Sequence, residues 1–208
     1  MPINREKSRE VNKGFFNAWA SFYDFSPLKP WLFFIQKELV KAIPIRELTS
    51  EVKILDVGCG TGDALLEMSK RGTAKLYGID LSEGMLNRAK KKLKGIAILR
   101  KGDVEHTGFK DSTFDYVLCT EAFHHFPNPN TALREMHRVL KKEGTCVIAD
   151  INFFSKIIHK LFRMIEPGHV SIYSRQQMKE LFEKNKFRVL KQGRIAVFAL
   201  YTIAQKTA

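Results

Sequence analysis

Three alternating glycines are the feature of this sequence best suited to bind a ligand. Segment 52–63, VKILDVGCGTGD, places Gly58, Gly60 and Gly62 after an apolar run and before a helix-like segment. Glycine lets the backbone turn tightly and lets a ligand approach without a Cβ in the way, and open amides at a helix start accept a polar or anionic group. A turn alone would explain one glycine, so three in alternation predict a ligand-binding loop.

The spacing of this loop differs from that of a dinucleotide-binding loop. The dinucleotide fingerprint is G-x-G-x-x-G, and here Asp63 occupies the sixth position. An acidic residue at that point disfavours a pyrophosphate. A nicotinamide-dependent oxidoreductase is therefore the least favoured function.

Acidic residues also follow the next two apolar runs. Asp80 ends the second run in YGIDLS, and Asp103 follows the third in RKGDVE. In a doubly wound sheet the Asp80 carboxylate lies beside the glycine loop and can accept two hydrogen bonds from a ribose diol. The alternative for Asp80 is a helix N-cap, a role that Ser82 could fill equally well.

Candidate acid–base residues follow the fourth apolar run. Glu121, His124 and His125 stand where an open α/β sheet binds its ligands. Two adjacent histidines in an extended segment point in opposite directions, so at most one faces a pocket. We prefer His124 as the general base; the alternative is that both imidazoles bond to turn carbonyls. No His or Cys spacing indicates a metal site.

The elements that must position these residues alternate between strand and helix. Near-continuous apolar runs predict parallel strands buried on both faces, at 52–57, 74–79, 96–99, 116–119 and 145–151. Two helices are predicted at 64–70 and 82–94. A third begins at an Asn128 cap, with Pro129 at its first position, and runs through Leu140. A fourth follows a Ser174–Gln177 capping box. Runs 187–190 and 194–202 flank a turn and predict an antiparallel strand pair.

Residues 1–50 break this alternation and are rich in aromatic side chains. We interpret them as two helices that cover the sheet core, because large aromatic side chains usually pack in cores. A lid over a ligand pocket is the functional alternative. We therefore divide the chain into an N-terminal helical cap at 1–50 and a sheet domain at 51–208.

Composition restricts the class of protein. The chain has 208 residues, 44% of them hydrophobic, a net charge of +13 and three cysteines, Cys59, Cys119 and Cys146, without metal or disulfide spacing. No targeting segment or stretch long enough to cross a bilayer is evident, so we expect a cytoplasmic protein. The positive charge allows an anionic partner, so a basic protein that binds RNA on this fold is a second hypothesis, ranked low because no RNA-recognition motif is present.

Five motifs in order carry a family resemblance: ILDVGCGTGD, GIDLS, KGDVE, FDYVLCTEAFHHF and LREMHRVLKKEGTCVIAD. Together they resemble the class I S-adenosylmethionine-dependent methyltransferases, type 11 group, which includes quinone-biosynthesis C-methyltransferases. The resemblance is good over about residues 50–150. It implies a Rossmann-like, doubly wound, seven-stranded, mostly parallel sheet with helices on both faces and a C-terminal antiparallel pair, and S-adenosylmethionine as cofactor, with S-adenosylhomocysteine as product.

The resemblance also implies roles for single residues. Asp56, Gly58, Gly60 and Thr61 would border the methionine part of the cofactor, with Thr120 near the methionyl end. Asp80 would hold the ribose, Asp103 and the Val104 amide would read the adenine, and Leu81 or Met85 would lie on its face. Tyr23, in ASFYD, resembles a tyrosine that closes over the cofactor in related enzymes, with plain packing as the alternative.

The acceptor is less clearly defined. The enzymes of this superfamily that methylate amino groups of DNA and protein commonly carry an Asn or Asp, Pro, Pro, aromatic loop after strand four, and this chain has TEAF there. That difference disfavours DNA as a substrate and leaves C-, O- or N-methylation of a small molecule. Segment 151–170 is apolar with interleaved basic residues and either shapes the acceptor pocket or rests on an anionic membrane. The oligomeric state stays open.

Overall fold

A seven-stranded sheet forms the centre of the molecule. The computed structural model describes residues 5–23, 29–43, 48–152, 171–195 and 199–207. Its strands are β1 Lys53–Val57, β2 Lys75–Asp80, β3 Ala97–Lys101, β4 Phe114–Thr120, β5 Leu140–Ile151, β6 Phe187–Ile195 and β7 Ala199–Lys206. Its helices are α1 Arg5–Tyr23, α2 Lys29–Ala42, α3 Asp63–Ser69, α4 Glu83–Leu93, the short 3₁₀ helix η1 Phe123–His125, α5 Pro129–Val139 and α7 Arg175–Lys184.

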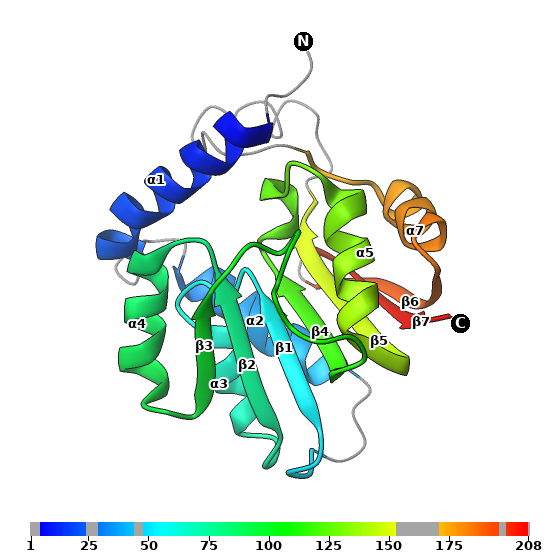
Figure 1. Cartoon of the computed structure of the whole chain (residues 1–208), viewed down its shortest axis with the longest axis horizontal. Coiled ribbons are helices and arrows are strands. Elements are labelled where there is room, and N and C mark those ends of the chain that lie inside the picture. Colours follow the sequence, from blue (N-terminus) through cyan, green and yellow to red (C-terminus); the bar gives the residue numbers. More distant parts are fainter. Residues whose placement is uncertain (1–4, 24–28, 44–47, 153–170, 196–198, 208) are drawn as a thin grey trace.

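The strand order confirms the predicted fold class. The strands run β3-β2-β1-β4-β5-β7-β6, parallel from β3 to β5 and antiparallel for β5·β7 and β6·β7 (Figure 1). The carboxyl ends of β1 and β4, which are neighbours in the sheet, therefore meet at one edge. This arrangement brings the glycine loop and the Glu121–His125 segment together.

Two boundaries differ from the sequence prediction. Leu140, expected on a helix, is already extended and pairs with Phe114, so β5 begins where α5 ends. Residues 191–193, expected as a turn, lie inside β6, and Gly193 faces Tyr201 of β7. Any Cβ at Gly193 would lie 2.5 Å from the Tyr201 hydroxyl oxygen, so this glycine serves close cross-strand packing instead of a turn.

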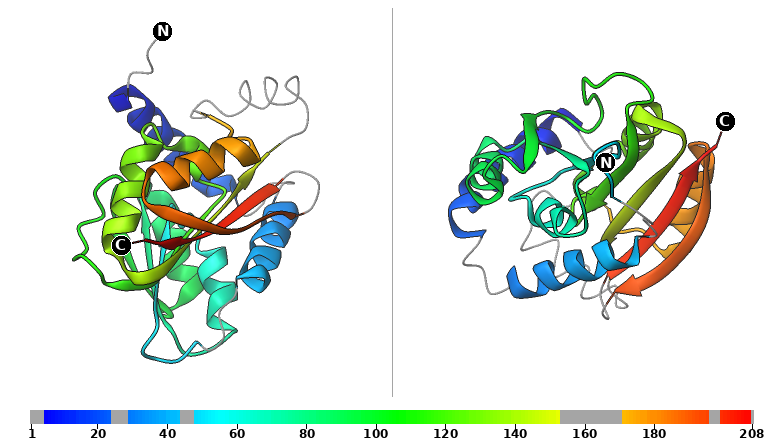
Figure 2. Two further views of the ribbon diagram at one scale, coloured as in Figure 1. Left: turned by 90° about the vertical axis from the view of Figure 1, so that its right-hand side faces the viewer. Right: turned by 90° about the horizontal axis from the view of Figure 1, so that it is seen from below.

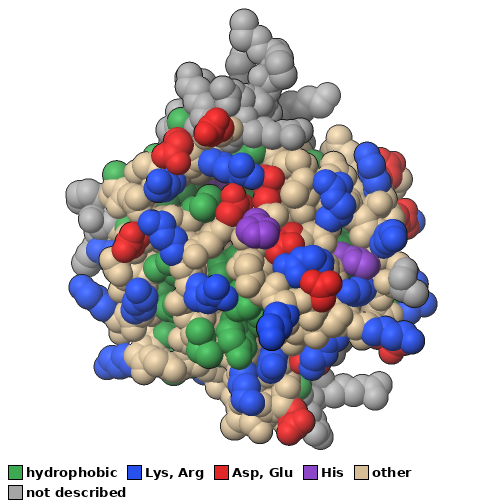
Figure 3. All heavy atoms as spheres, in the orientation of Figure 1, with side chains coloured by type: hydrophobic (Ala, Val, Ile, Leu, Met, Phe, Trp, Pro, Cys, Tyr) green, Lys and Arg blue, Asp and Glu red, His purple; other side chains and the backbone are tan. Residues whose placement is uncertain are grey.

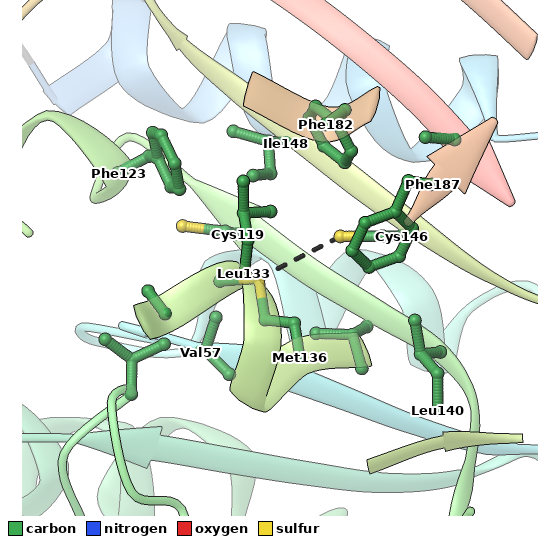
Figure 4. Close-up of a cluster of buried hydrophobic side chains, with 14 of the residues drawn as sticks. Val57, Cys119, Phe123, Leu133, Met136, Leu140, Cys146, Ile148, Phe182 and Phe187 are labelled. Carbon is green, nitrogen blue, oxygen red and sulfur yellow. Dashed lines mark hydrogen bonds between the residues drawn. The ribbon is translucent and has the colours of Figure 1, made fainter. Parts of the chain in front are cut away.

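Helices cover both faces of the sheet. On one face α2, α3 and α4 bury side chains such as Leu39, Met68 and Leu86, and α2 lies beside α3 and β6 (Figure 2). On the other face α5 packs against β5, and α7 packs against β6 and β7. Leu133, Met136, Phe182 and Phe187 lie around Cys119 and Cys146 there (Figure 4). The Cys146 sulfur lies 3.9 Å from the Met136 sulfur, so both are packing residues.

Predicted helix caps account for where the helices begin. The Ser82 hydroxyl accepts a hydrogen bond from the Met85 amide at the start of α4. Asn128 caps α5 with Pro129 at its first position, and the Ser174–Gln177 capping box opens α7. These caps fix where each helix begins relative to the sheet edge.

The two N-terminal helices, α1 and α2, pack on different helices of the sheet domain. Helix α1 packs on α4, across the end of the sheet where α4 begins, whereas α2 packs on α3 (Figure 1). Within the described part of the chain, no helix combines the length and apolar character that a bilayer span requires. Segment 153–170 and the Tyr23 side chain, both named above, lie outside what the structure describes.

Candidate active site

One cleft opens at the carboxyl ends of the parallel strands. It encloses about 950 Å³ including its open mouth. Nine of the ten residues predicted to bind the cofactor line it: Gly58, Gly60, Thr61, Asp80, Leu81, Met85, Asp103, Val104 and Thr120. The tenth, Asp56, is fully buried and is not part of the lining.

The glycine loop packs closely against the segment after β4 and against α4. Gly58, Gly60 and Gly62 all have positive φ, at 70°, 51° and 81°. A Cβ on Gly58 would lie 2.7 Å from Ala122 Cβ and one on Gly62 would lie 2.8 Å from Leu93 Cδ1, whereas one on Gly60 would meet nothing within 4 Å. Gly58 and Gly62 therefore let the loop pack, and Gly60 leaves open space in the cleft for a ligand to approach the backbone.

Asp80 connects the loop to the start of α4. One carboxylate oxygen accepts the Gly60 amide at 2.9 Å and the other accepts the Ser82 amide at 2.8 Å. Burial raises the pKa of Asp80, and these two backbone hydrogen bonds oppose that rise. Ser82 is the cap of α4, which leaves the Asp80 carboxylate at the cleft wall, with lone pairs available to a diol.

Asp56 is a buried carboxyl group beneath the loop. Neither of its oxygens has a hydrogen-bond partner in the described chain. Burial raises its pKa well above the ordinary range, and the neighbouring Asp80 charge adds to the rise. A cation bound nearby would favour its ionised form, so Asp56 is suited to support a positively charged ligand.

The negative charge of Asp63 in the cleft is paired with the positive charge of Lys92. Lys92 donates to the Asp63 carboxylate at 2.7 Å and to the Thr61 hydroxyl at 2.9 Å, and Thr61 donates to Asp63 at 3.0 Å. The sequence argument that an acidic charge at this position repels pyrophosphate is therefore weakened, because Lys92 compensates it. The missing glycine at that position still separates this loop from the dinucleotide fingerprint.

Helix α1 forms one wall of the cleft. Arg9 contacts Asp103 at 3.1 Å and Glu105 at 2.7 Å, and Asn12 donates to the His125 carbonyl at 3.0 Å. Asn17 accepts hydrogen bonds from the Ser82 hydroxyl and the Gly84 amide. These bonds attach α1 to both sides of the cleft.

The two histidines have different surroundings from those predicted. His125 lines the cleft, whereas His124 Nδ1 lies 2.5 Å from a buried Asp150 oxygen and His124 is not part of the lining. The 3₁₀ turn at 123–125 sets the two rings at different angles, 45° apart. His124, the preferred candidate from the sequence, therefore does not line the cleft, whereas its neighbour His125 does.

Glu121 lies on the same wall with a left-handed backbone, φ 53°, and its amide donates to Ala149 O. This conformation is costly for a residue with a side chain and is commonly kept at functional sites.

Sequence reasoning did not single out the α1 and α2 residues that line the cleft: Arg9, Asn12, Lys13, Phe16 and Gln36. The concentration of aromatic residues at 15–34 was the one available signal, and it indicated a lid only as an alternative.

Comparison with known proteins decides the family. The sequence profile described as "Methyltransferase domain" matches residues 55–148. The chain is 30% identical over 193 residues to the demethylmenaquinone methyltransferase of Staphylococcus aureus, covering 85% of this chain and 77% of that protein. This chain belongs to the class I S-adenosylmethionine-dependent methyltransferases, type 11 group.

Solved structures agree with the methyltransferase fold. A Haloferax volcanii methyltransferase, solved in complex with the Trm112 methyltransferase activator, superposes with a TM-score of 0.83 at 21% identity, over 93% of this chain and 98% of that one. Phosphoethanolamine N-methyltransferase 2 of Haemonchus contortus, solved with S-adenosylmethionine, gives 0.74 at 13% identity, over 93% and 60%. The methyltransferase is therefore an enzyme that uses S-adenosylmethionine as its cofactor.

The residues present fit this cofactor. S-adenosylmethionine carries an ammonium and a sulfonium, and the cleft offers the Asp80 and Glu121 carboxylates, with Asp56 behind the loop. The open space before Gly60 admits a ligand against the backbone. An acidic cradle suits a cationic ligand better than a pyrophosphate.

Proposed function

We propose that this methyltransferase acts on a small hydrophobic acceptor that carries an ionisable proton, with hydroxylated aromatic compounds of the quinol type as the first class to test. The observation that carries the proposal is a single imidazole on an apolar wall. His125 stands in the cleft beside Phe16, Phe126 and Pro127. The Staphylococcus aureus relative, named for demethylmenaquinone, supports the same acceptor class.

We propose the following division of the cofactor site, retaining the predicted roles. The ribose hydroxyls bind Asp80, and the adenine lies between Asp103, the Val104 amide, Leu81 and Met85. The methionine part lies along the loop, near Asp56, Gly58, Gly60, Thr61 and Thr120. The contacts of Asp80 with the Gly60 and Ser82 amides support this division, because they fix the carboxylate before a ligand arrives.

When bound, S-adenosylmethionine supplies a methyl group on a positively charged sulfur. The chain must align the acceptor with that methyl and keep water out, which α1 and the apolar wall are placed to do. His125 would take the proton of an acceptor hydroxyl, and the electron pair left on that oxygen, or shared with the neighbouring ring carbon, would bond to the methyl carbon. A methylated ring carbon would then lose its own proton, and the electron pair of the broken carbon–sulfur bond would stay with the sulfur, so charge balances.

We propose that α1 is the cap over this cleft. Arg9 and Asn12 attach it to opposite walls. Tyr23, the last residue of α1, stays our candidate for the lid side chain. The division into a cap at 1–50 and a catalytic domain at 51–208 belongs to the same proposal.

The test is a turnover assay with a defined panel of acceptors. The purified chain is incubated with S-adenosylmethionine and, separately, a short-chain demethylmenaquinol, a catechol and phosphoethanolamine, and S-adenosylhomocysteine is quantified. We expect product with the quinol or catechol, and a loss of about 100-fold in turnover in His125→Ala, in keeping with general base catalysis. Lys75→Ala, on the exposed start of β2, is the matched control.

Product from phosphoethanolamine alone would overturn the acceptor class, and full activity of His125→Ala would overturn the role of the imidazole.

A further inference from the structure

A buried carboxylate stands behind the two histidines. Asp150, near the end of β5, accepts the backbone amides of His124 at 2.6 Å and Ile151 at 2.8 Å, and one oxygen lies 2.5 Å from His124 Nδ1. Asp150 is 5% exposed and His124 3% exposed. Because the carboxylate accepts all three contacts, Nδ1 of His124 carries the hydrogen, and the lone pair of the neutral ring is on Nε2.

The His124 ring in turn lies against the ring of His125. The two ring centroids are 3.9 Å apart. Phe16 of α1 contacts the His125 ring edge to face, with centroids 4.9 Å apart, and Asn12 holds the His125 carbonyl. Contacts from β5, η1 and α1 therefore fix the imidazole at the cleft wall.

We infer that Asp150 and His124 form a buried pair that positions the His125 imidazole in the cleft and stabilises its protonated form. The inference rests on the proposed function, in which His125 accepts the acceptor's proton. A protonated His125 is a cation in a poorly solvated wall, so the Asp150 charge, with the polarised His124 ring between them, lowers its energy. Asp150 and His124 are positioning residues, since neither lines the cleft.

Other titratable groups near the histidines do not take over this role. Burial raises the pKa of the Cys119 thiol and of the Tyr173 phenol, so both stay neutral near pH 7. Glu121 follows β4 and lines the cleft together with Lys13 of α1. Glu121 and Lys13 therefore lie on the cleft side of the His125 imidazole, whereas Asp150, which does not line the cleft, lies behind that ring.

The test is a ¹⁵N NMR titration of the histidines with S-adenosylhomocysteine present. His125→Gln assigns the His125 signal, and His124→Gln assigns His124. In the unchanged chain we expect His124 as the Nδ1–H tautomer and a His125 midpoint above the ordinary value of about 6.5. Asp150→Asn, which keeps the shape and an acceptor oxygen, should lower that midpoint by about one pH unit. Asp111→Asn, on the exposed loop before β4, should leave it unchanged.

Two results would overturn the inference: an Nε2–H tautomer of His124 in the unchanged chain, or a His125 midpoint that is the same in Asp150→Asn. Should Asp150→Asn fail to fold, the His124 tautomer and the His125 midpoint of the unchanged chain test the inference on their own. A His125 midpoint below about 6.5 would then also overturn the inference. The turnover assay with the quinol and the catechol on the same samples separates this inference from the proposed function. Absent turnover with an intact histidine response would count against the function alone.

Discussion

At the scale of single residues, the site depends on carboxylates held by backbone amides. Asp80 accepts one amide on each oxygen, and Asp150 accepts two amides and an imidazole. Such bonds set the direction of each carboxylate before any ligand binds. A substitution at either residue should therefore affect both the local backbone and the step that the carboxylate supports.

Asp80→Ala should weaken binding of S-adenosylhomocysteine by about 100-fold, because two charge-assisted hydrogen bonds to a ribose are worth about 3 kcal/mol. Isothermal titration calorimetry measures this loss. Glu83→Ala removes an exposed carboxylate three positions away, at the start of α4, and should bind as tightly as the unchanged chain. Equal affinity of the unchanged chain and Asp80→Ala would contradict the ribose assignment.

Glu135 carries a pH-dependent part of the stability. Burial alone would raise its pKa, but hydrogen bonds from Arg138 and Thr107 hold the pKa of Glu135 down at about 2. A carboxyl with a lowered pKa stabilises the fold above its ordinary pKa, near 4.5, and loses that contribution as the pH falls toward 2.

We expect Glu135→Gln to lower the free energy of unfolding by about 2 kcal/mol at pH 7 and to flatten its pH dependence between 4.5 and 2. Urea unfolding at a series of pH values measures both. Glu143→Gln, on an exposed position of β5, is the control. A pH dependence unchanged in Glu135→Gln would contradict this account.

At the scale of elements, the cleft is assembled by packing α1 against a sheet that supplies the other walls. Helix α1 contacts α4 and reaches the 121–127 segment through Asn12 and Phe16. The attachments are a few polar bonds and one ring contact, so the helix can hold a ligand in place and still release it.

Asn12→Ala removes the hydrogen bond from α1 to His125 and should weaken binding of S-adenosylhomocysteine about fivefold, the cost of about 1 kcal/mol. The dissociation rate, measured by stopped-flow fluorescence, should rise by a similar factor. Glu10→Ala, on the exposed side of α1, is the matched control. A dissociation rate that Asn12→Ala leaves unchanged would show that α1 does not retain the ligand.

At the scale of the whole molecule, charged side chains are spread over the surface seen in Figure 3, whereas apolar side chains gather in one part of it. Lys and Arg side chains spread over the face seen in Figure 3, interrupted by acidic ones, and form no continuous basic groove there. Green side chains gather on the same face (Figure 3). The large hydrophobic residues that are exposed include Ile98, 55% exposed, in the edge strand β3, and Ile96, 45% exposed, just before it.

Ile98→Lys tests whether this edge contributes to the fold of the single chain. We expect the free energy of unfolding to change by less than about 0.5 kcal/mol, because the side chain is mostly in water, and self-association at high concentration to fall. Urea unfolding and light scattering measure the two effects. Leu99→Lys, whose side chain packs against the core, should instead destabilise clearly. A loss of stability in Ile98→Lys similar to that of Leu99→Lys would contradict this expectation.

The sequence by itself determined the fold class and, through the family resemblance, nine of the residues that line the cleft. Alternating apolar runs predicted the parallel strands, and three glycines with Asp80 and Asp103 at strand ends predicted the cleft. These features are local. A backbone that must turn at Gly58 and a carboxylate that must end β2 restrict the residue types at a few neighbouring positions, and the sequence shows that restriction directly.

The tertiary structure alone decided which residues from distant segments meet. His124 and His125 are neighbours with the same side chain, but in the fold the His124 ring contacts Asp150 on the adjacent strand, whereas His125 lines the cleft. Lys92 compensates Asp63 from another helix, and Asn12 reaches His125 across 113 residues. Such contacts depend on how elements pack, and packing leaves no periodic pattern in the chain, so they became visible only in the fold.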